Sequence, residues 1–216
     1  MRTLAVLPVK SFGLAKQRLS AAVGEDERRA LAHAMAGDVL EALGHVEGLD
    51  GVVVVTAEAL DLGISGFELV HDPDEAGQSA AAGRGVRTAI ARGAQRVLLV
   101  PGDCPALDPR EVAGLLAAEP SGVVIVPDRH GSGTNALLIS PPTAIGPSFG
   151  PGSFARHAAL AYAAGAAVRV AQAPSLELDV DTPDDLAALR TALAERPDTA
   201  VRTRALLERL AGLRAA

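Results

Sequence analysis

The sequence predicts a single α/β domain in which a mostly parallel central sheet is covered by helices on both faces. Two observations predict this fold. Short runs of apolar, often β-branched residues alternate along the chain with longer stretches whose apolar residues recur at helical spacing. The chain of 216 residues contains no internal repeat, low-complexity segment or linker. We therefore assign residues 1–216 to one domain.

The predicted strands are short and largely apolar. They cover residues 3–9, 51–56, 67–71, 96–101, 122–127, 135–140 and 168–171. The first, second and fourth have the sequences TLAVLPV, GVVVVT and RVLLVP. Continuous apolar runs of this kind are typical of strands in a parallel sheet, because both faces of such a sheet are covered.

The predicted helices lie between these strands. They cover residues 25–43, 77–92, 109–118, 153–164, 182–193 and 199–213. Asp108 and Thr182 are expected N-caps because each precedes a proline suited to a first helical turn, and Ser153 is the expected N-cap of its helix. Gly83 and Gly85 lack the third glycine of a dinucleotide-binding fingerprint, so we expect them to serve helix packing.

The composition disfavours several classes of protein. The formal net charge is −6 and aromatic residues make up 2% of the chain, so the basic surface and stacking rings of a nucleic-acid binder are absent from the sequence. The single cysteine, Cys104, excludes an internal disulfide and fits a reducing compartment. No apolar run approaches the roughly 20 residues of a membrane span. We expect a cytoplasmic protein with neither nucleic acid nor membrane as a partner.

Lysine occurs in only one short segment of the chain. Of the 20 basic residues, only Lys10 and Lys16 are lysines, and they follow the first predicted strand together with Arg18. Arginine does not replace lysine where a compact charge must fit among phosphate oxygens. These three cations, near the start of a helix, predict an anion site, and the alternative for Lys16 and Arg18 is a solvated helix face. Neither a Walker A loop nor a GxGxxG fingerprint is present.

Two acidic segments are candidates for a metal site. Asp103 follows the apolar strand 96–101, and Asp179 and Asp181 project to the same side if their segment is extended. Helix capping and the helix dipole explain Asp184 and Asp185 but not these three. Because ligands bind beyond the carboxyl ends of parallel strands, we expect Asp103 and Asp181 to meet and hold Mg²⁺, with Asp179 as a third candidate.

Two glycine-rich segments predict a second anion site. Thr134 ends the segment Gly-Ser-Gly-Thr, and Ser153 follows Gly150 and Gly152. Glycines allow a small ligand to approach the backbone closely, and the start of a helix offers free N–H groups. A plain loop is the alternative for either segment alone. Together with the cationic first loop, they favour two separate anionic substrates.

In combination these motifs resemble the CofC/FbiD guanylyltransferases of the nucleotidyltransferase superfamily. The resemblance rests, in chain order, on Pro8-Val9-Lys10, Ala15-Lys16-x-Arg18-Leu19, Gly102-Asp103-x-Pro105, Gly131-x-Gly133-Thr134-Asn135, Phe149-Gly150-x-Gly152-Ser153 with His157, and Asp179-x-Asp181-Thr182-Pro183-x-Asp185-Leu186. The last motif is shared across the superfamily, whereas the lysine-rich opening and the two glycine-rich motifs are more specific. The L-x-A-G-G opening of sugar-nucleotide enzymes is absent.

The resemblance implies a Rossmann-like nucleotidyltransferase fold and a reaction that joins GTP to a phosphorylated three-carbon acid and releases pyrophosphate. The expected acid is phosphoenolpyruvate, and the product would pass to a downstream transferase in the biosynthesis of coenzyme F-420. The alternatives are 2-phospho-L-lactate or 3-phosphoglycerate as the acceptor, a molybdopterin- or cytidylyl-type nucleotidyltransferase, and a nucleotide-binding module without turnover. The last helix would pack on its own sheet or on the partner chain of a homodimer.

The resemblance also implies roles for individual residues. The catalytic residues would be Lys16, Asp103 and Asp181, and the ligands of Mg²⁺ would be Asp103, Asp179 and Asp181. The acceptor acid would be bound by Thr134, Gly150 and Ser153. The nucleotide would be bound by Lys10, Lys16, Arg18, Asp74, Gln78 and Ser79. At the expected guanine site, Gln78-Ser79 departs from the Leu-Asn that is typical of the family.

Overall fold

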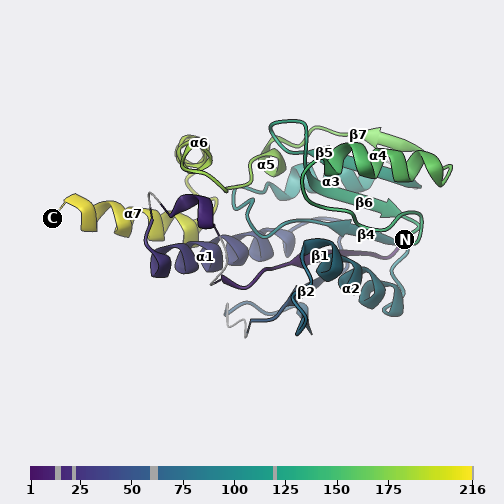
Figure 1. Cartoon of the computed structure of the whole chain (residues 1–216), viewed down its shortest axis with the longest axis horizontal. Helices are drawn as coiled ribbons and strands as arrows, with labels where there is room; N and C mark the ends of the chain where they lie inside the picture. The colour runs from purple at the N-terminus through teal and green to yellow at the C-terminus, as the bar shows by residue number, and fades with distance from the viewer. Residues whose placement is uncertain (13–15, 21–22, 59–62, 119–120, 216) are drawn as a thin grey trace.

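In the computed structural model, the described part of the chain contains one sheet of seven strands, in the order β3-β2-β1-β4-β6-β5-β7 (Figure 1). The structure describes residues 1–12, 16–20, 23–58, 63–118 and 121–215, so the predicted loop 10–15 lies partly outside the described residues. The strands are β1 (Thr3–Pro8), β2 (Val52–Thr56), β3 (Phe67–His71), β4 (Arg96–Leu99), β5 (Gly122–Pro127), β6 (Thr134–Ser140) and β7 (Val168–Val170). All seven predicted strands are confirmed, within one or two residues at most ends.

The six predicted helices are also present. The helices are η2 (Gln17–Leu19), α1 (Glu25–Leu43), α2 (Gln78–Ala91), α3 (Pro109–Ala118), α4 (Ser153–Ala163), α5 (Pro174–Glu177), α6 (Pro183–Ala194) and α7 (Val201–Ala215). The short elements η2 and α5 were not predicted, because a single helical turn leaves no periodic pattern of apolar residues. None of the helices that the structure describes is both long and apolar enough to cross a membrane.

One strand runs against the rest of the described sheet. β6 pairs antiparallel with β4 and with β5, whereas the other four strand pairs are parallel. The prediction of a mostly parallel sheet is therefore confirmed. Because β6 is reversed, its first residues, Thr134 and Asn135, lie at the edge of the sheet where β1 and β4 end.

Helices cover both faces of the sheet, as the alternation of strands and helices predicts. On one face, α1, α3 and α5 bury side chains such as Val39, Leu115 and Leu176 against the strands. On the other face, α2 and α4 contribute Val86 and Ala161 to a second apolar cluster. Figure 1 shows α2 and α4 on the near side of the sheet and α1 behind it.

Helix α2 approaches the sheet closely at Gly85. A Cβ atom at this position would lie 2.3 Å from a methyl carbon of Val6 and 3.0 Å from one of Val55. These distances are shorter than a carbon–carbon contact allows, so only glycine fits here without a shift of the helix. The expectation that this mid-helix glycine serves packing is confirmed.

The last helix packs on its own chain. Leu206, Leu207 and Leu210 of α7 lie in a third cluster with apolar side chains of α1 and α6. Asp38 of α1 accepts hydrogen bonds from the main-chain N–H groups of Arg202 (3.0 Å) and Thr203 (2.8 Å), which belong to the first turn of α7. The helix therefore packs on α1 and α6 rather than on the sheet. The expected homodimer stays a prediction.

Candidate active site

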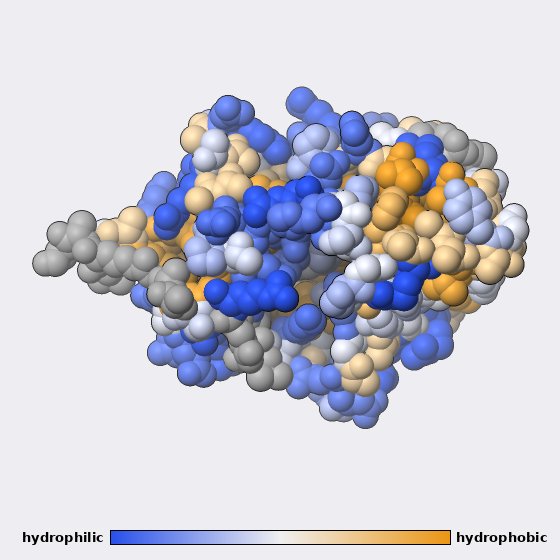
Figure 2. Space-filling model, turned by 45° about the horizontal axis from the view of Figure 1, so that its top comes forward, coloured by the Kyte–Doolittle hydropathy of each residue, from blue (hydrophilic) through white to orange (hydrophobic). Residues whose placement is uncertain are grey.

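A cavity of about 560 Å³ opens at the edge of the sheet where β1 and β4 end. Its volume lies in the range typical of small-molecule sites. Hydrophilic residues surround a hollow near the middle of the face that Figure 2 shows. Ten of the predicted site residues line the cavity: Lys10, Lys16, Arg18, Gln78, Asp103, Thr134, Gly150, Ser153, Asp179 and Asp181. The structure thus gathers most of the predicted site in one place.

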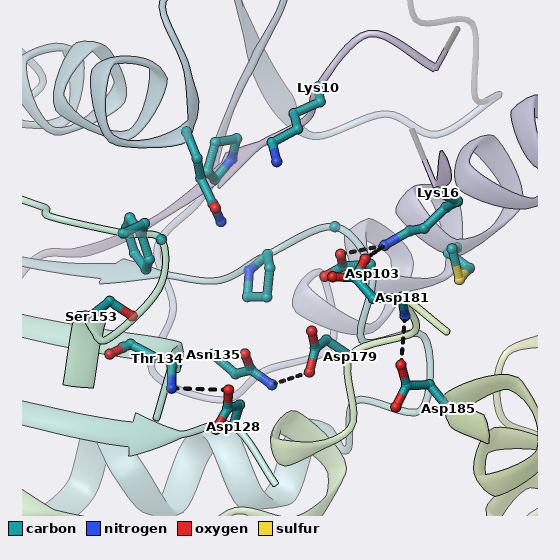
Figure 3. A pocket seen from close by; sticks show the side chains of 18 of the residues that line it. Lys10, Lys16, Asp103, Asp128, Thr134, Asn135, Ser153, Asp179, Asp181 and Asp185 are labelled. Carbon is teal, nitrogen blue, oxygen red and sulfur yellow. Dashed lines mark hydrogen bonds and ion pairs between the residues drawn. The ribbon is translucent and has the colours of Figure 1, made fainter. Parts of the chain in front are cut away.

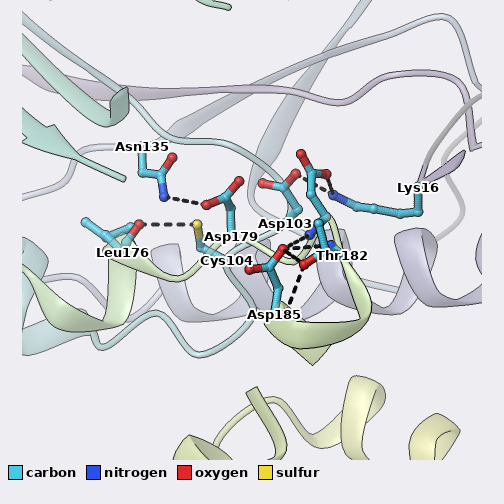
Figure 4. A network of polar contacts seen from close by, with 9 residues as sticks. Lys16, Asp103, Cys104, Asn135, Leu176, Asp179, Thr182 and Asp185 are labelled. Atoms are coloured by element: carbon cyan, nitrogen blue, oxygen red, sulfur yellow. Dashed lines mark hydrogen bonds and ion pairs between the residues drawn. The ribbon is translucent and has the colours of Figure 1, made fainter. Parts of the chain in front are cut away.

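The ammonium group of Lys16 lies between two carboxylates. Its Nζ is 2.5 Å from Oδ2 of Asp103 and 2.9 Å from Oδ1 of Asp181 (Figures 3 and 4). Asp103 follows β4, and Asp181 immediately precedes the N-cap of α6. The two distant acidic segments therefore meet, and they face one of the two lysines of the chain.

Lys16 carries a permanent charge in this setting. Its side chain is only 7% exposed. This burial by itself lowers its pKa, but the carboxylates of Asp103 and Asp181 outweigh that effect and raise the pKa above the usual value for lysine. A buried, fully protonated point charge is suited to phosphate oxygens that carry developing negative charge.

The acidic side of the pocket carries more negative charge than Lys16 offsets. Burial raises the pKa of Asp179, and the nearby charge of Asp103 raises it further, while a hydrogen bond from Nδ2 of Asn135 (3.1 Å) opposes both. Oδ1 of Asp103 is buried and accepts no hydrogen bond from the described residues. Both observations fit a cation beside these carboxylates. Among the described residues, no group of three or more His, Cys, Asp or Glu side chains is arranged so that it could hold a metal ion.

Asp185 holds the turn that carries Asp181. Its Oδ2 accepts hydrogen bonds from the main-chain N–H groups of Asp181 (3.0 Å) and Thr182 (2.7 Å), and from the hydroxyl of Thr182 (2.8 Å). Thr182 in turn accepts from the N–H of Asp185, so the predicted N-cap is confirmed as a reciprocal capping box (Figure 4). Arg129 forms an ion pair with the same carboxylate at 2.5 Å. Partial burial alone would raise the pKa of Asp185, but these contacts lower it.

Thr134 and Ser153 lie at the end of the pocket away from Lys16 (Figure 3). Ser153 is the first residue of α4, and its N-cap is Gly152, which adopts φ 71°. The prediction that Ser153 is the N-cap is therefore wrong. The left-handed conformation of Gly152, which glycine adopts without strain, turns the chain into the helix one residue earlier. Ser153 is free of a capping role, and its side chain faces a pocket that it lines.

The loop between β6 and α4 is held from two sides. The guanidinium of Arg156 donates hydrogen bonds to the carbonyl oxygens of Ser148 and Phe149, both at 3.0 Å, and also contacts those of Gly150 and Pro151. On the other side, Oγ of Ser79 accepts the main-chain N–H of Phe149 at 2.8 Å. Ser79 therefore supports the loop that carries Gly150.

The residues expected at the guanine site divide into two groups. Gln78, the first residue of α2, lines the pocket. Asp74 and Ser79 are not among the lining residues. Asp74 forms an ion pair with Arg84 at 2.9 Å, and the same guanidinium lies 3.2 Å from Asp72. The guanine contacts of these residues stay predictions.

Asp128, at the end of β5, supports the loop that leads to Thr134. Its Oδ1 accepts the N–H groups of His130 (3.1 Å) and Ser132 (2.9 Å), and its Oδ2 accepts that of Gly133 (2.9 Å). A Cβ atom on Gly133 would lie 2.5 Å from this carboxylate. The sequence predicted Asp128 to follow a strand but gave it no role, although an aspartate before a glycine-rich segment is the signal of such a side-chain-capped turn.

Cys104 has no catalytic position. Its thiol is fully buried and donates a hydrogen bond to the carbonyl oxygen of Leu176 at 3.4 Å (Figure 4). Burial raises the pKa of the thiol, and the carboxylates of Asp103 and Asp179 raise it further, so the reactive thiolate is disfavoured. Cys104 is therefore a buried packing residue.

A family model, curated relatives and solved structures were each found to be similar to this chain. The model of the family described as "Guanylyl transferase CofC like" matches residues 3–192. A phosphoenolpyruvate guanylyltransferase from Conexibacter woesei is 50% identical over 216 residues, which cover 97% of each chain. A second, from Sphaerobacter thermophilus, is 39% identical over 86% of this chain and 91% of its own length. A solved structure from Desulfovibrio desulfuricans G20 is described as a nucleotide-diphospho-sugar transferase. The structural match includes 99% of this chain and 97% of that chain, with a TM-score of 0.77 and 19% sequence identity. At that identity the likeness shows the fold.

Proposed function

The chain belongs to the family of CofC-like guanylyl transferases, and from this premise we propose that it joins GTP to phosphoenolpyruvate. An oxygen of the acceptor phosphate forms a bond to the α-phosphorus of GTP. The bond from this phosphorus to the oxygen that bridges to the β-phosphate breaks, and pyrophosphate leaves. The product is enolpyruvoyl-2-diphospho-5'-guanosine. Such a transfer depends on positioning and on neutralising charge more than on a base.

The observation that carries this proposal is the position of Lys16 between Asp103 and Asp181, inside the pocket. We assign its ammonium group to the α-phosphate and to the departing pyrophosphate, where negative charge grows during the reaction. Lys10 and Arg18, which line the same pocket, would offset the remaining charge of the pyrophosphate. In this proposal the cationic residues bind the triphosphate, and the carboxylates bind the metal ion.

We propose that Mg²⁺ binds here through Asp103 and Asp181, with Asp179 as an alternative ligand. The buried, unpartnered Oδ1 of Asp103 and the raised pKa of Asp179 support a cation at this place. Mg²⁺ in sites of this kind takes one or two carboxylates and completes its ligands with phosphate oxygens and water. When bound, the ion would supply charge neutralisation to both phosphate groups.

The acceptor acid would occupy the opposite end of the pocket. Thr134 and Ser153 offer hydroxyl groups there, and Gly150 allows close approach to the backbone. A carboxylate has acceptor oxygens that suit such groups. This end of the pocket is where phosphoenolpyruvate would be distinguished from 2-phospho-L-lactate or 3-phosphoglycerate.

The cellular setting follows from the same proposal. The single, buried thiol of Cys104 suits a reducing cytoplasm, in which we place the reaction. The product would be passed to a downstream transferase that consumes the activated acid. No contact with nucleic acid or membrane is required by this chemistry.

The test is the release of pyrophosphate from GTP, Mg²⁺ and phosphoenolpyruvate, with the product identified by mass. Parallel reactions with 2-phospho-L-lactate and 3-phosphoglycerate report the acceptor, and reactions with CTP report the nucleotide. We expect turnover with GTP and phosphoenolpyruvate. Absence of pyrophosphate release with GTP and each of the three acids contradicts the proposal, and turnover with CTP alone assigns the chain to cytidylyl transfer.

A further inference from the structure

His157, on α4, lies buried below the acceptor end of the pocket and forms a hydrogen bond through each ring nitrogen. Its Nδ1 is 3.0 Å from the hydroxyl oxygen of Thr134, and its Nε2 is 2.9 Å from the main-chain nitrogen of Ser148. The ring of Phe149 packs edge-on against it, with ring centroids 5.1 Å apart. The imidazole has no exposed surface, so it acts on a substrate only through its neighbours.

The two hydrogen bonds determine which nitrogen carries the proton. The N–H of Ser148 can only donate, so Nε2 of His157 must accept and is unprotonated. Burial lowers the pKa of His157 to about 4, and the charge of the adjacent Arg156 lowers it as well, so the ring is neutral near pH 7. The single proton of a neutral imidazole then lies on Nδ1, which donates to Thr134.

This donation restricts the hydroxyl of Thr134. A hydroxyl that accepts a hydrogen bond from His157 must direct its own proton to another partner, and Thr134 lines the pocket. We propose that His157 is a positioning residue that makes the Thr134 hydroxyl a hydrogen-bond donor to an anionic oxygen of the acceptor acid. This inference rests on the proposed function, because the acceptor acid supplies the anionic oxygen.

The same ring also anchors the loop beside the acceptor. The bond from Ser148 to His157 fixes the start of the loop that leads to Gly150, while Arg156 takes up carbonyl oxygens of that loop. Two adjacent residues of α4 thus hold the loop. His157 accepts a main-chain N–H of the loop, and Arg156 donates to its carbonyl oxygens. The His157 ring therefore contacts both Thr134, on β6, and the loop that carries Gly150.

A double-mutant cycle separates this role from simple packing. In His157→Gln the amide oxygen can take the place of Nε2 as the acceptor for Ser148, but no donor remains at the position of Nδ1. Thr134→Val removes the hydroxyl while keeping the shape of the side chain. We expect His157→Gln to raise the KM for phosphoenolpyruvate about tenfold, as the loss of a directed hydrogen bond to a charged group does, with the KM for GTP unchanged. In the Thr134→Val background the same substitution should leave the KM for phosphoenolpyruvate unchanged.

Additive effects in that cycle, or an equal rise in the KM for GTP, would overturn the inference. Leu160→Ala, on the exposed side of α4, is the matched control and should leave both KM values unchanged. The melting temperature of each variant shows whether it is folded.

The ring tautomer can be measured without turnover. The ¹⁵N resonances of the His157 ring in the free protein should report a neutral Nδ1–H tautomer between pH 8 and pH 6. A ring protonated on Nε2 would overturn the inference even if the enzyme is active. A wild-type chain with the expected tautomer but no turnover of GTP with phosphoenolpyruvate would instead overturn the proposed function, so the two failures are distinguishable.

Discussion

Nζ of Lys16 lies 2.5 Å from Oδ2 of Asp103, although 87 positions of the sequence separate the two residues. Lys16 directly precedes η2, while Asp103 follows a strand in the middle of the sheet. Their contact joins the only lysine-bearing segment of the chain to its acidic segments. The chemistry proposed for the site therefore depends on this pair, and the first two predictions concern its members.

Replacement of Lys16 by arginine should reduce kcat about 100-fold. The space between Asp103 and Asp181 holds a compact ammonium group, and a planar guanidinium cannot take the same position. Pyrophosphate release from GTP and phosphoenolpyruvate measures the effect. Arg110→Lys, at an exposed position of α3 outside the lining of the pocket, is the control and should leave kcat unchanged. Equal losses in both variants would contradict a special role of Lys16.

The Asp103→Asn variant should lose between about 100-fold and 1,000-fold of kcat. The substitution keeps the shape of the side chain but removes the charge next to Lys16 and the proposed Mg²⁺. Asp184→Asn, at an exposed position in the first turn of α6, is the matched control. Retention of normal turnover by Asp103→Asn would show that its carboxylate is not part of the reaction.

For Asp179, removal of the charge should have opposite effects on stability and on metal binding. Its pKa is raised by burial and by Asp103, so the ionised carboxylate lowers the free energy of unfolding near pH 7. Asp179→Asn should therefore melt at a higher temperature than the wild type without Mg²⁺, since Asn135 can still donate to the new side chain. Addition of Mg²⁺ should raise the melting temperature of the wild type more than that of the variant. An equal Mg²⁺ effect in both proteins would exclude Asp179 as a ligand.

The stability contributed by His157 should depend on pH. Its pKa falls from 6.5 to about 4 on folding, so the unfolded chain takes up a proton between these values while the folded chain does not. The contribution is complete above pH 6.5 and decreases as the pH falls toward 4. The difference in urea midpoint between the wild type and His157→Gln should shrink over this window. A difference that does not change with pH would contradict the low pKa.

Two glycine-to-alanine substitutions should change the free energy of unfolding in opposite directions. Gly85→Ala places a methyl group against Val6 and should lower the free energy of unfolding by about 2 kcal/mol. Gly114→Ala, in α3, meets no atom within 4 Å and should raise it by up to about 1 kcal/mol through helix propensity. Chemical denaturation measures both. A destabilised Gly114→Ala variant would contradict the open space found beside that glycine.

The sequence predicted the elements well because local patterns determine them. The strands β1, β2 and β4 are continuous apolar runs, and Thr182 with Asp185 forms the capping box that its spacing indicates. The reversal of β6 was not predicted, since the direction of a buried strand leaves no trace in its apolar pattern. Helix α5 was missed because it has only four residues.

The site was predicted in its composition but not in its contacts. The rule that side chains at the ends of parallel strands meet correctly placed Asp103 near Asp181. The position of Lys16 between them was not predicted, because spacing along the sequence does not report such a contact. Asp128 and His157 act through main-chain N–H groups of loops, and such bonds depend on backbone conformation rather than on spacing. The N-cap of α4 differed by one residue because glycine can adopt a left-handed conformation there.

The reversed direction of β6 also bears on how this active centre can evolve. The hairpin between β5 and β6, residues 128–133, lines the pocket at the end proposed for the acceptor acid, whereas Asp103 follows β4, which pairs in parallel with β1. We expect that insertions or deletions in that hairpin can change the shape of this end of the pocket without shifting the register of β1 against β4. Under the proposed function, the preference for one small acid over another could then change between relatives while the residues proposed to bind GTP stay in place.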